Sequence, residues 1–301
     1  MNWNPTRLPS LPAVLAGTAA AAAVIVVQPA VAQTARDVAR IAVPTTVRID
    51  NLLSPANGGS GVIIARKGKV YTVLTANHVV ENPNAEYQIS TSKNGTHPVL
   101  SVQSLQTTPD APDLAIVTFE SKTKQAIAPL ADSNEASIGS GVYISGFPQA
   151  ADDPSVREYE FTSGQVTSRP SRRPKGYTMR YDAVTRRGMS GGPVFDVSGR
   201  VVGIHGQGDR DAVVRNEAAG SDGTTEIKTG FNAAVPVNTF LQLASQSGIN
   251  ISKVKIDDEP PENVDAERVS RQEVRSWEQE FAKGAGLMIL RELIRLPFRL
   301  F

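Results

Sequence analysis

Three short segments of this chain carry the residue types that a hydroxyl nucleophile needs. They are Thr-Ala-Asn-His78, Asp113-Leu-Ala and Gly-Met-Ser190-Gly-Gly-Pro. A serine hydroxyl attacks an amide only when a base that titrates near neutral pH takes its proton, and that base needs an anion to orient it and stabilise its cationic form. Ser190, His78 and Asp113 are therefore the candidate nucleophile, base and orienting carboxylate.

Each of these assignments has an alternative reading. The chain holds only three histidines, which favours a role for His78, although a hydrogen-bonded structural histidine is the alternative. Asp113 precedes an apolar run where an unpaired charge would be costly to bury, so we expect an imidazole partner; Asp110 is the nearby rival. Glycines before and after Ser190 allow turns that point backbone N–H groups inward. We expect the N–H groups of Gly188 and Ser190 to form an oxyanion hole.

The elements that must position these residues are predicted to be strands. Short apolar or alternating runs, separated by turn-forming glycine, asparagine and proline, fill the chain after Thr34 and predict an all-β sandwich or barrel with a junction between two halves near 129–139. A helix is predicted from Pro236 to Ser245. The predicted strands are 46–49, 61–65, 70–75, 87–91, 115–119, 142–145, 160–167, 178–182, 193–195, 201–205 and 231–235.

The three segments around His78, Asp113 and Ser190 resemble those of the chymotrypsin/trypsin-like serine peptidases. The resemblance spans roughly Val43 to Ser245. It implies two antiparallel six-stranded β-barrels with the catalytic triad between them, a C-terminal helix, protein or peptide substrates, and no cofactor or metal.

Within that class the chain resembles the bacterial glutamyl endopeptidases, through the Met179–Thr185 stretch and Val-Gly-Ile-His205-Gly. By that match, His205 and Thr185 would bind an acidic substrate side chain, since an imidazole and a hydroxyl can both hydrogen-bond a carboxylate. Val184 would stand at the pocket floor and argue against lysine or arginine. The alternative is that His205 is an ordinary strand residue. Gly206 and Gly208 could expose backbone for pairing with the substrate.

Two residues depart from the family pattern. Met189 stands where these families carry Asp or Asn, so it cannot order the oxyanion loop through an ion pair or an amide. Gly206 replaces the aromatic residue that glutamyl endopeptidases tend to have beside the pocket histidine. The first departure requires another residue to hold the loop, and the second weakens the predicted preference for glutamate.

Composition and the N-terminus address the chain's location and partners. The formal net charge is +1, with 31 basic and 30 acidic residues, so no nucleic-acid footprint is present. The absence of cysteine excludes disulfides and thiol nucleophiles. Arg7, an apolar run at 11–27 and Ala30-Val-Ala32 indicate a signal peptide over 1–32 and a secreted or periplasmic protein. An uncleaved membrane anchor is the alternative.

The remaining chain divides into a peptidase domain at 33–245, an acidic and proline-containing linker at 246–265, and an amphipathic helical tail at 266–301. The tail alternates apolar residues with arginines, which suits a membrane surface or a protein partner, with packing back on the barrels as the alternative. Two competing hypotheses remain for the whole chain. It could be an inactive peptidase-like module that binds peptides or partners, or the tail could be its functional part.

Overall fold

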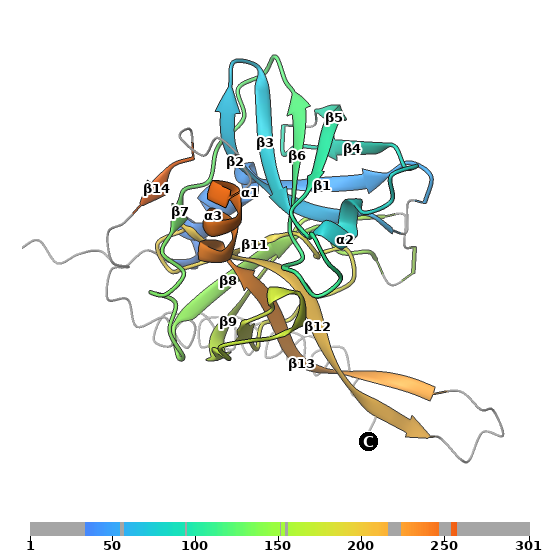
Figure 1. Ribbon diagram of the computed structural model, residues 1–301, viewed down its shortest axis with the longest axis vertical. Helices are drawn as coiled ribbons and strands as arrows, with labels where there is room; N and C mark the ends of the chain where they lie inside the picture. Colours follow the sequence, from blue (N-terminus) through green and yellow to red (C-terminus); the bar gives the residue numbers. More distant parts are fainter. Residues whose placement is uncertain are drawn as a thin grey trace, which may run out of the picture. The chain divides into compact units, whose positions relative to one another are not determined.

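The computed structural model describes residues 34–54, 57–93, 95–150, 152–153, 156–215, 224–246 and 254–257. The predicted signal peptide, and the predicted tail and most of the predicted linker, lie outside these residues. The described chain is mostly β and forms two closed six-stranded antiparallel barrels (Figure 1), which confirms the predicted fold class.

The first barrel closes through the strand order β1-β2-β3-β6-β5-β4. Its interior is a cluster of aliphatic and aromatic side chains that includes Ile49, Tyr71, Val73 and Phe119. Tyr71 and Phe119 stack with their ring centroids 5.4 Å apart. The strands are β1 (Thr46–Asn51), β2 (Gly59–Lys67), β3 (Val70–Thr75), β4 (Tyr87–Ser90), β5 (Thr96–Ser104) and β6 (Ala115–Glu120).

The second barrel follows the order β11-β8-β9-β10-β13-β12 and closes through the pairing of β11 with β12. Two short strands, β7 (Leu130–Ala131) and β14 (Ile256–Asp257), pair in parallel at its edge. The barrel strands are β8 (Gly141–Gly146), β9 (Glu160–Ser168), β10 (Met179–Tyr181), β11 (Pro193–Phe195), β12 (Val201–Arg215) and β13 (Thr224–Pro236). The last two form a long hairpin that extends away from the barrel (Figure 1).

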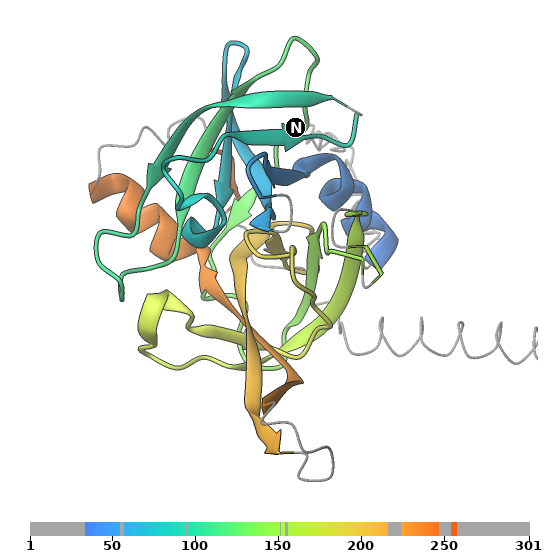
Figure 2. The ribbon, with the colours of Figure 1, turned by 90° about the vertical axis from the view of Figure 1, so that its right-hand side faces the viewer.

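Helix α1 (Ala35–Thr45) was not predicted, and it corrects the expectation of strands directly after Thr34. Thr34 and Asp37 form a capping box, in which each side chain accepts a hydrogen bond from the other residue's backbone N–H. Val38 and Ala42 bury one face of the helix in the core. In Figure 2, α1 (blue) and α3 (orange; Val237–Gln246) lie on opposite sides of the barrels.

The predicted C-terminal helix is α3. It packs against β12 and β13, and Phe240 and Ala244 are buried beneath it in the core. Among the described helices, none combines the length and the apolar character that crossing a membrane would require.

Polar contacts join the two barrels where they meet. The hydroxyl groups of Thr46 and Ser145 lie 2.7 Å apart and are buried. The backbone N–H of Ser60 on β2 donates to the carbonyl of Ser190 at 2.7 Å. Because Ser60 belongs to the first barrel and Ser190 to a loop of the second, this bond fixes the position of Ser190 relative to both.

We expect Phe240→Ala to destabilise the fold by about 3–5 kcal/mol, because it removes a large side chain that is 1% exposed and leaves a cavity. The neighbouring Gln242 is exposed, so Gln242→Ala should change stability by less than about 0.5 kcal/mol. Equilibrium unfolding in urea measures both. Equal effects of the two substitutions would contradict the docking of α3 on the barrels.

Candidate active site

The carboxylate of Asp113 is buried and fully bonded at the junction between the barrels. It is 1% exposed and accepts three hydrogen bonds. Oδ1 accepts from the backbone N–H of His78 at 2.9 Å, and Oδ2 lies 2.7 Å from His78 Nδ1. Oδ2 also accepts from the hydroxyl of Tyr177 at 2.6 Å. The imidazole is therefore held by both its backbone and its ring.

Burial alone would raise the pKa of Asp113, because the charged form loses its hydration. The hydrogen bonds and the charge of His78, together with the hydroxyl of Tyr177, outweigh burial and lower that pKa to about 2. Asp113 is accordingly a carboxylate at neutral pH. Asp110, the rival in the sequence, is exposed and uses its backbone carbonyl to accept from the N–H of Lys175.

A tight turn at Pro174–Gly176 carries Tyr177 to this carboxylate. Lys175 adopts φ 58°, a left-handed conformation that is rare outside glycine. Its carbonyl accepts from the N–H of Asp113 at 3.0 Å, so the turn holds the backbone of Asp113 while Tyr177 holds its side chain. Burial and the nearby charge of Asp113 raise the pKa of Tyr177, which keeps its hydroxyl protonated and able to donate.

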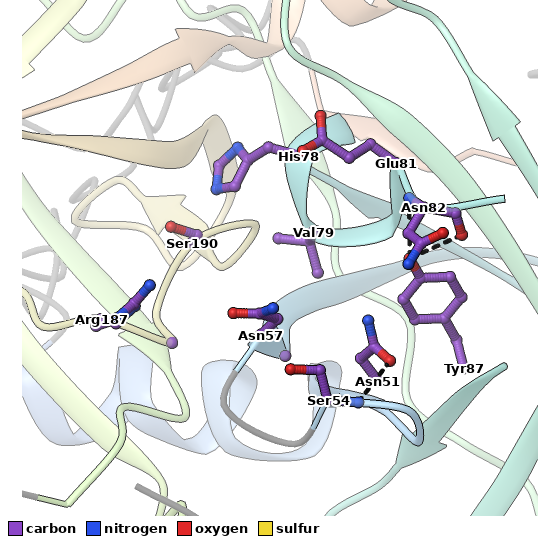
Figure 3. A pocket seen from close by; sticks show the side chains of 12 residues that line it. Asn51, Ser54, Asn57, His78, Val79, Glu81, Asn82, Tyr87, Arg187 and Ser190 are labelled. Carbon is purple, nitrogen blue, oxygen red and sulfur yellow. Dashed lines mark hydrogen bonds between the residues drawn. The ribbon is translucent and has the colours of Figure 1, made fainter. Parts of the chain in front are cut away.

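His78 and Ser190 line one cavity of about 360 Å³. His78 lies on the four-residue helix α2 (Asn77–Val80), and Ser190 lies on the loop between β10 and β11. Figure 3 shows the imidazole and the Ser190 hydroxyl facing the same space. Most of the other lining side chains are polar, with Val79 as an apolar exception, and they come largely from the first barrel. They include Asn51, Ser54, Asn57, Glu81, Asn82 and Tyr87, with Arg187 from the loop.

The backbone around Ser190 leaves two amides unused. Gly188 and Gly191 have φ of 95° and 84°, values that side-chain-bearing residues rarely adopt. The N–H groups of Gly188 and Ser190 donate to no other group among the described residues. Two amides of one tight loop beside a serine hydroxyl can bind a developing oxyanion.

His205, the candidate pocket histidine, is buried on β12 at 3% exposure. Its Nδ1 lies 2.6 Å from the hydroxyl of Tyr181. Tyr181 is completely buried, and burial raises its pKa well above the ordinary value, so its hydroxyl remains protonated. A phenol that donates to Nδ1 leaves the ring proton of a neutral imidazole on Nε2, whereas a phenol that accepts from Nδ1 leaves Nε2 without one.

Thr185 has a different partner from the one that the sequence suggests. Its hydroxyl donates to the side-chain oxygen of Asn232. The amide nitrogen of Asn232 donates to the carbonyls of Ala183 and Gly230, which fixes the orientation of the amide. The proton of Thr185 is therefore committed to Asn232. Val184, the preceding residue, is 68% exposed.

The two glycines on β12 lie beside these groups. A Cβ on Gly206 would stand 2.3 Å from the Tyr177 hydroxyl oxygen, so only glycine leaves room for that hydroxyl. A Cβ on Gly208 would stand 3.3 Å from the Asn232 side-chain oxygen. The predicted pocket strand therefore packs closely against Tyr177, the partner of Asp113, at Gly206.

The structure brings His78, Ser190 and Gly188 together around one cavity, with Asp113 bonded to His78 outside its lining. It groups Thr185, His205 and Gly208 around Tyr181 and Asn232. Sequence reasoning missed Tyr177, Tyr181 and Asn232. Tyr181 lies in the Met179–Thr185 stretch that carries the resemblance. Tyr177 and Asn232 carry no local motif, because their partners are distant in sequence.

Comparison with known proteins agrees with this geometry. Residues 59–204 match the model of the trypsin-like peptidase domain. A probable periplasmic serine endoprotease DegP-like from Brucella suis is 29% identical over 196 residues, covering 64% of this chain and 33% of that protein. The glutamyl endopeptidase of Staphylococcus aureus is 29% identical over 215 residues, covering 67% of this chain and 57% of that protein.

The chain therefore spans about a third of the length of the DegP-like relative and somewhat more than half of the glutamyl endopeptidase. Two closed six-stranded barrels, a bonded His–Asp pair beside a serine in a glycine-rich loop, and the match over residues 59–204 lead to one conclusion. Residues 59–204 carry a trypsin-like peptidase domain.

Proposed function

We propose that this protein is a serine endopeptidase in which Ser190 is the nucleophile, His78 the general base and Asp113 the orienting carboxylate. One observation carries the proposal. A buried carboxylate binds both the backbone N–H and the ring Nδ1 of His78, and that imidazole shares a cavity with the hydroxyl of Ser190. A buried carboxylate is costly unless it is paired, and the partner of this one is the imidazole beside Ser190.

The reaction follows from this placement. Ser190 Oγ attacks the substrate carbonyl carbon while His78 Nε2 takes the hydroxyl proton, and the carbonyl oxygen becomes an oxyanion bound by the N–H groups of Gly188 and Ser190. The imidazolium, stabilised by Asp113, then protonates the leaving amine as the C–N bond breaks. Water, deprotonated by His78, releases the acyl group from Ser190 by the same steps in reverse.

We further propose that the pocket beside β12 prefers glutamate, with His205 as the main donor. In the proposed tautomer the Tyr181 hydroxyl donates to His205 Nδ1 and Nε2 carries the ring proton, for which a charged carboxylate is a strong acceptor. Thr185 is not assigned as a donor to the substrate carboxylate, because its hydroxyl proton is donated to Asn232 and an ionised carboxylate only accepts. The similarity to a glutamyl endopeptidase supports this preference.

Export from the cytoplasm is part of the proposal. Residues 1–32 have the basic start, apolar run and small-residue site of a signal peptide. The DegP-like relatives are named as periplasmic proteins. The substrates would then be proteins or peptides outside the cytoplasm.

A mixed peptide library, analysed by mass spectrometry, tests the proposed activity. The chain beginning at Gln33 should cleave it, and Ser190→Ala should lower turnover on the order of 10⁶-fold, because the nucleophile is lost. Cleavage that persists in Ser190→Ala would sink the assignment of Ser190. A folded wild-type protein that binds peptides without cutting them would favour the inactive binding module.

The role of Tyr177 predicts a change in the pH profile. Tyr177→Phe removes one donor from the Asp113 carboxylate, so the carboxylate stabilises the His78 imidazolium more strongly and the acid limb of kcat/KM moves to higher pH. The maximal rate should fall on the order of tenfold, since a hydrogen bond to a charged group is lost. Tyr71→Phe is the matched control, because its hydroxyl contacts Gln125 inside the first barrel. A profile that coincides with that of Tyr71→Phe would contradict the role of Tyr177.

Specificity is tested at His205. His205→Gln should lower kcat/KM for glutamate substrates by about 10–100-fold relative to matched glutamine substrates, the value of one charge-assisted hydrogen bond. His97→Gln serves as control, since His97 packs on Phe119 in the first barrel. An unchanged glutamate-to-glutamine ratio in His205→Gln would leave the triad in place and remove the role of His205 in specificity.

A further inference from the structure

Arg157 is a buried cation at the junction between the two barrels, and neither the triad nor the pocket explains it. Its side chain is 1% exposed. Its guanidinium donates to four backbone carbonyls, which come from both barrels and from the loop that carries Ser190. The bonds reach Ile49 (3.0 Å), Gly59 (2.6 Å), Phe147 (2.9 and 3.0 Å) and Gly188 (3.0 Å).

The surrounding chain is built to hold this cation. Burial lowers the pKa of Arg157 to about 10, which leaves it charged at neutral pH. Asp50 lies 3.5 Å from Nη1 and supplies a partly compensating charge. A Cβ on Gly58 would stand 2.1 Å from Nη1, so glycine is required at that position. A charge so deeply buried persists only when its donors are bonded.

Two backbone carbonyls fix the orientation of the candidate oxyanion loop. One accepts a hydrogen bond from Arg157 itself, and the other accepts from a residue paired with Arg157. The carbonyl of Gly188 accepts from Arg157 Nη2 and also from Ser60 Oγ at 2.8 Å. The carbonyl of Arg187 accepts from the N–H of Gln149 at 2.9 Å, and Gln149 forms a β-bridge with Arg157. In a trans peptide the N–H points opposite to the preceding carbonyl. The N–H of Gly188 is therefore turned away from Gln149.

Met189 leaves the loop without a charged anchor of its own. It is 0% exposed and packs in the second barrel's core with Tyr181 and Val194. Its Sδ accepts only a weak hydrogen bond from the N–H of Arg186 at 3.4 Å, and this contact does not reach the peptide groups beside Gly188. Selecting the orientation of those peptide groups requires a polar partner for their carbonyls.

We propose that Arg157 is a positioning residue, which holds the Arg187–Ser190 loop in its oxyanion-binding conformation by binding the Gly188 carbonyl. The inference rests on the proposed peptidase function. Arg157 does not touch the substrate. It acts through the peptide groups on either side of Gly188, and it supplies from within the folded barrels the polar anchor that Met189 cannot provide.

Kinetics of Arg157→Lys test this role against a purely structural one. A lysine keeps the charge but cannot reach the carbonyls of Gly188, Phe147 and Gly59 together. We expect kcat to fall about 100-fold, as misplaced oxyanion donors cost rate rather than binding. KM should change less than about threefold. Affinity for a peptide aldehyde, whose hemiacetal oxygen occupies the oxyanion position, should fall in parallel with kcat.

Arg200→Lys is the matched control, because Arg200 is also buried and pairs with Asp196 at 2.8 Å away from the cavity. It should lower the unfolding midpoint while kcat and aldehyde affinity stay near wild type. If Arg157→Lys lowers only the unfolding midpoint, as Arg200→Lys does, the positioning role is overturned. A loss of kcat and aldehyde affinity confined to Arg157→Lys supports it.

A crystal structure of Arg157→Lys separates this inference from the peptidase proposal. A wild-type protein that cleaves nothing would overturn the proposed function, yet the orientation of the Arg187–Gly188 peptide can be observed in either case. An inverted or disordered peptide in the variant, beside an ordered one in the wild type and in Arg200→Lys, supports the inference. An unchanged peptide overturns it.

Discussion

A carboxylate buried at the junction of two barrels is the constraint on which the candidate site depends. Asp113 cannot remain charged there without donors, and the donors must come from what surrounds it. His78 provides two from α2 of the first barrel, and Tyr177 provides one from the turn before β10 of the second. The two barrels thus share one charge. The same bonds that make its burial tolerable hold His78 against the cavity that it shares with Ser190.

Arg157 is a buried charge of opposite sign, and hydrogen bonds satisfy it in the same way. Asp113 draws N–H and O–H donors to it, whereas Arg157 draws carbonyl acceptors from β1, β2, the end of β8 and the loop of Ser190. One buried ion orients the imidazole and the other orients the peptide groups opposite it. Each barrel alone could supply only some of the hydrogen-bond partners of Asp113 or of Arg157. Assembly of the candidate site is therefore coupled to the docking of the barrels, where further polar contacts such as Thr46 with Ser145 also form.

The sequence predicted what is encoded locally. The glycines beside Ser190 demand unusual backbone angles, and the apolar run after Asp113 defines the start of β6, so both could be recognised without coordinates. The strand β5 was missed because most of its residues are exposed and Pro98 interrupts it. Helix α1 was missed because Ile41, Val43 and Pro44 resemble a strand boundary, while its capping box and the burial of Val38 decide for helix.

The partners that could not be predicted are those that act across long separations. Tyr177 lies 64 residues from Asp113, and Asn232 lies 47 residues from Thr185. A tyrosine or asparagine in such a segment has many structural uses, and only the folded register selects one. Thr185 illustrates the consequence, since the sequence suggested a substrate for its hydroxyl, whereas in the fold that hydroxyl donates to the distant Asn232.

Gly206 shows how a departure from a family pattern acquires a physical meaning. In the sequence it appears as a missing aromatic beside the candidate pocket histidine, and so as a weakness in the specificity argument. In the fold, any side chain there would collide with the Tyr177 hydroxyl, which donates to Asp113. The adjacent His205 is instead supported by Tyr181 from β10. In this chain glycine stands at position 206, and two tyrosines support the neighbouring groups: Tyr177 donates to Asp113, and Tyr181 is hydrogen-bonded to His205. Substitution at Gly206 would therefore disturb the Asp113 site before it altered the choice of substrate.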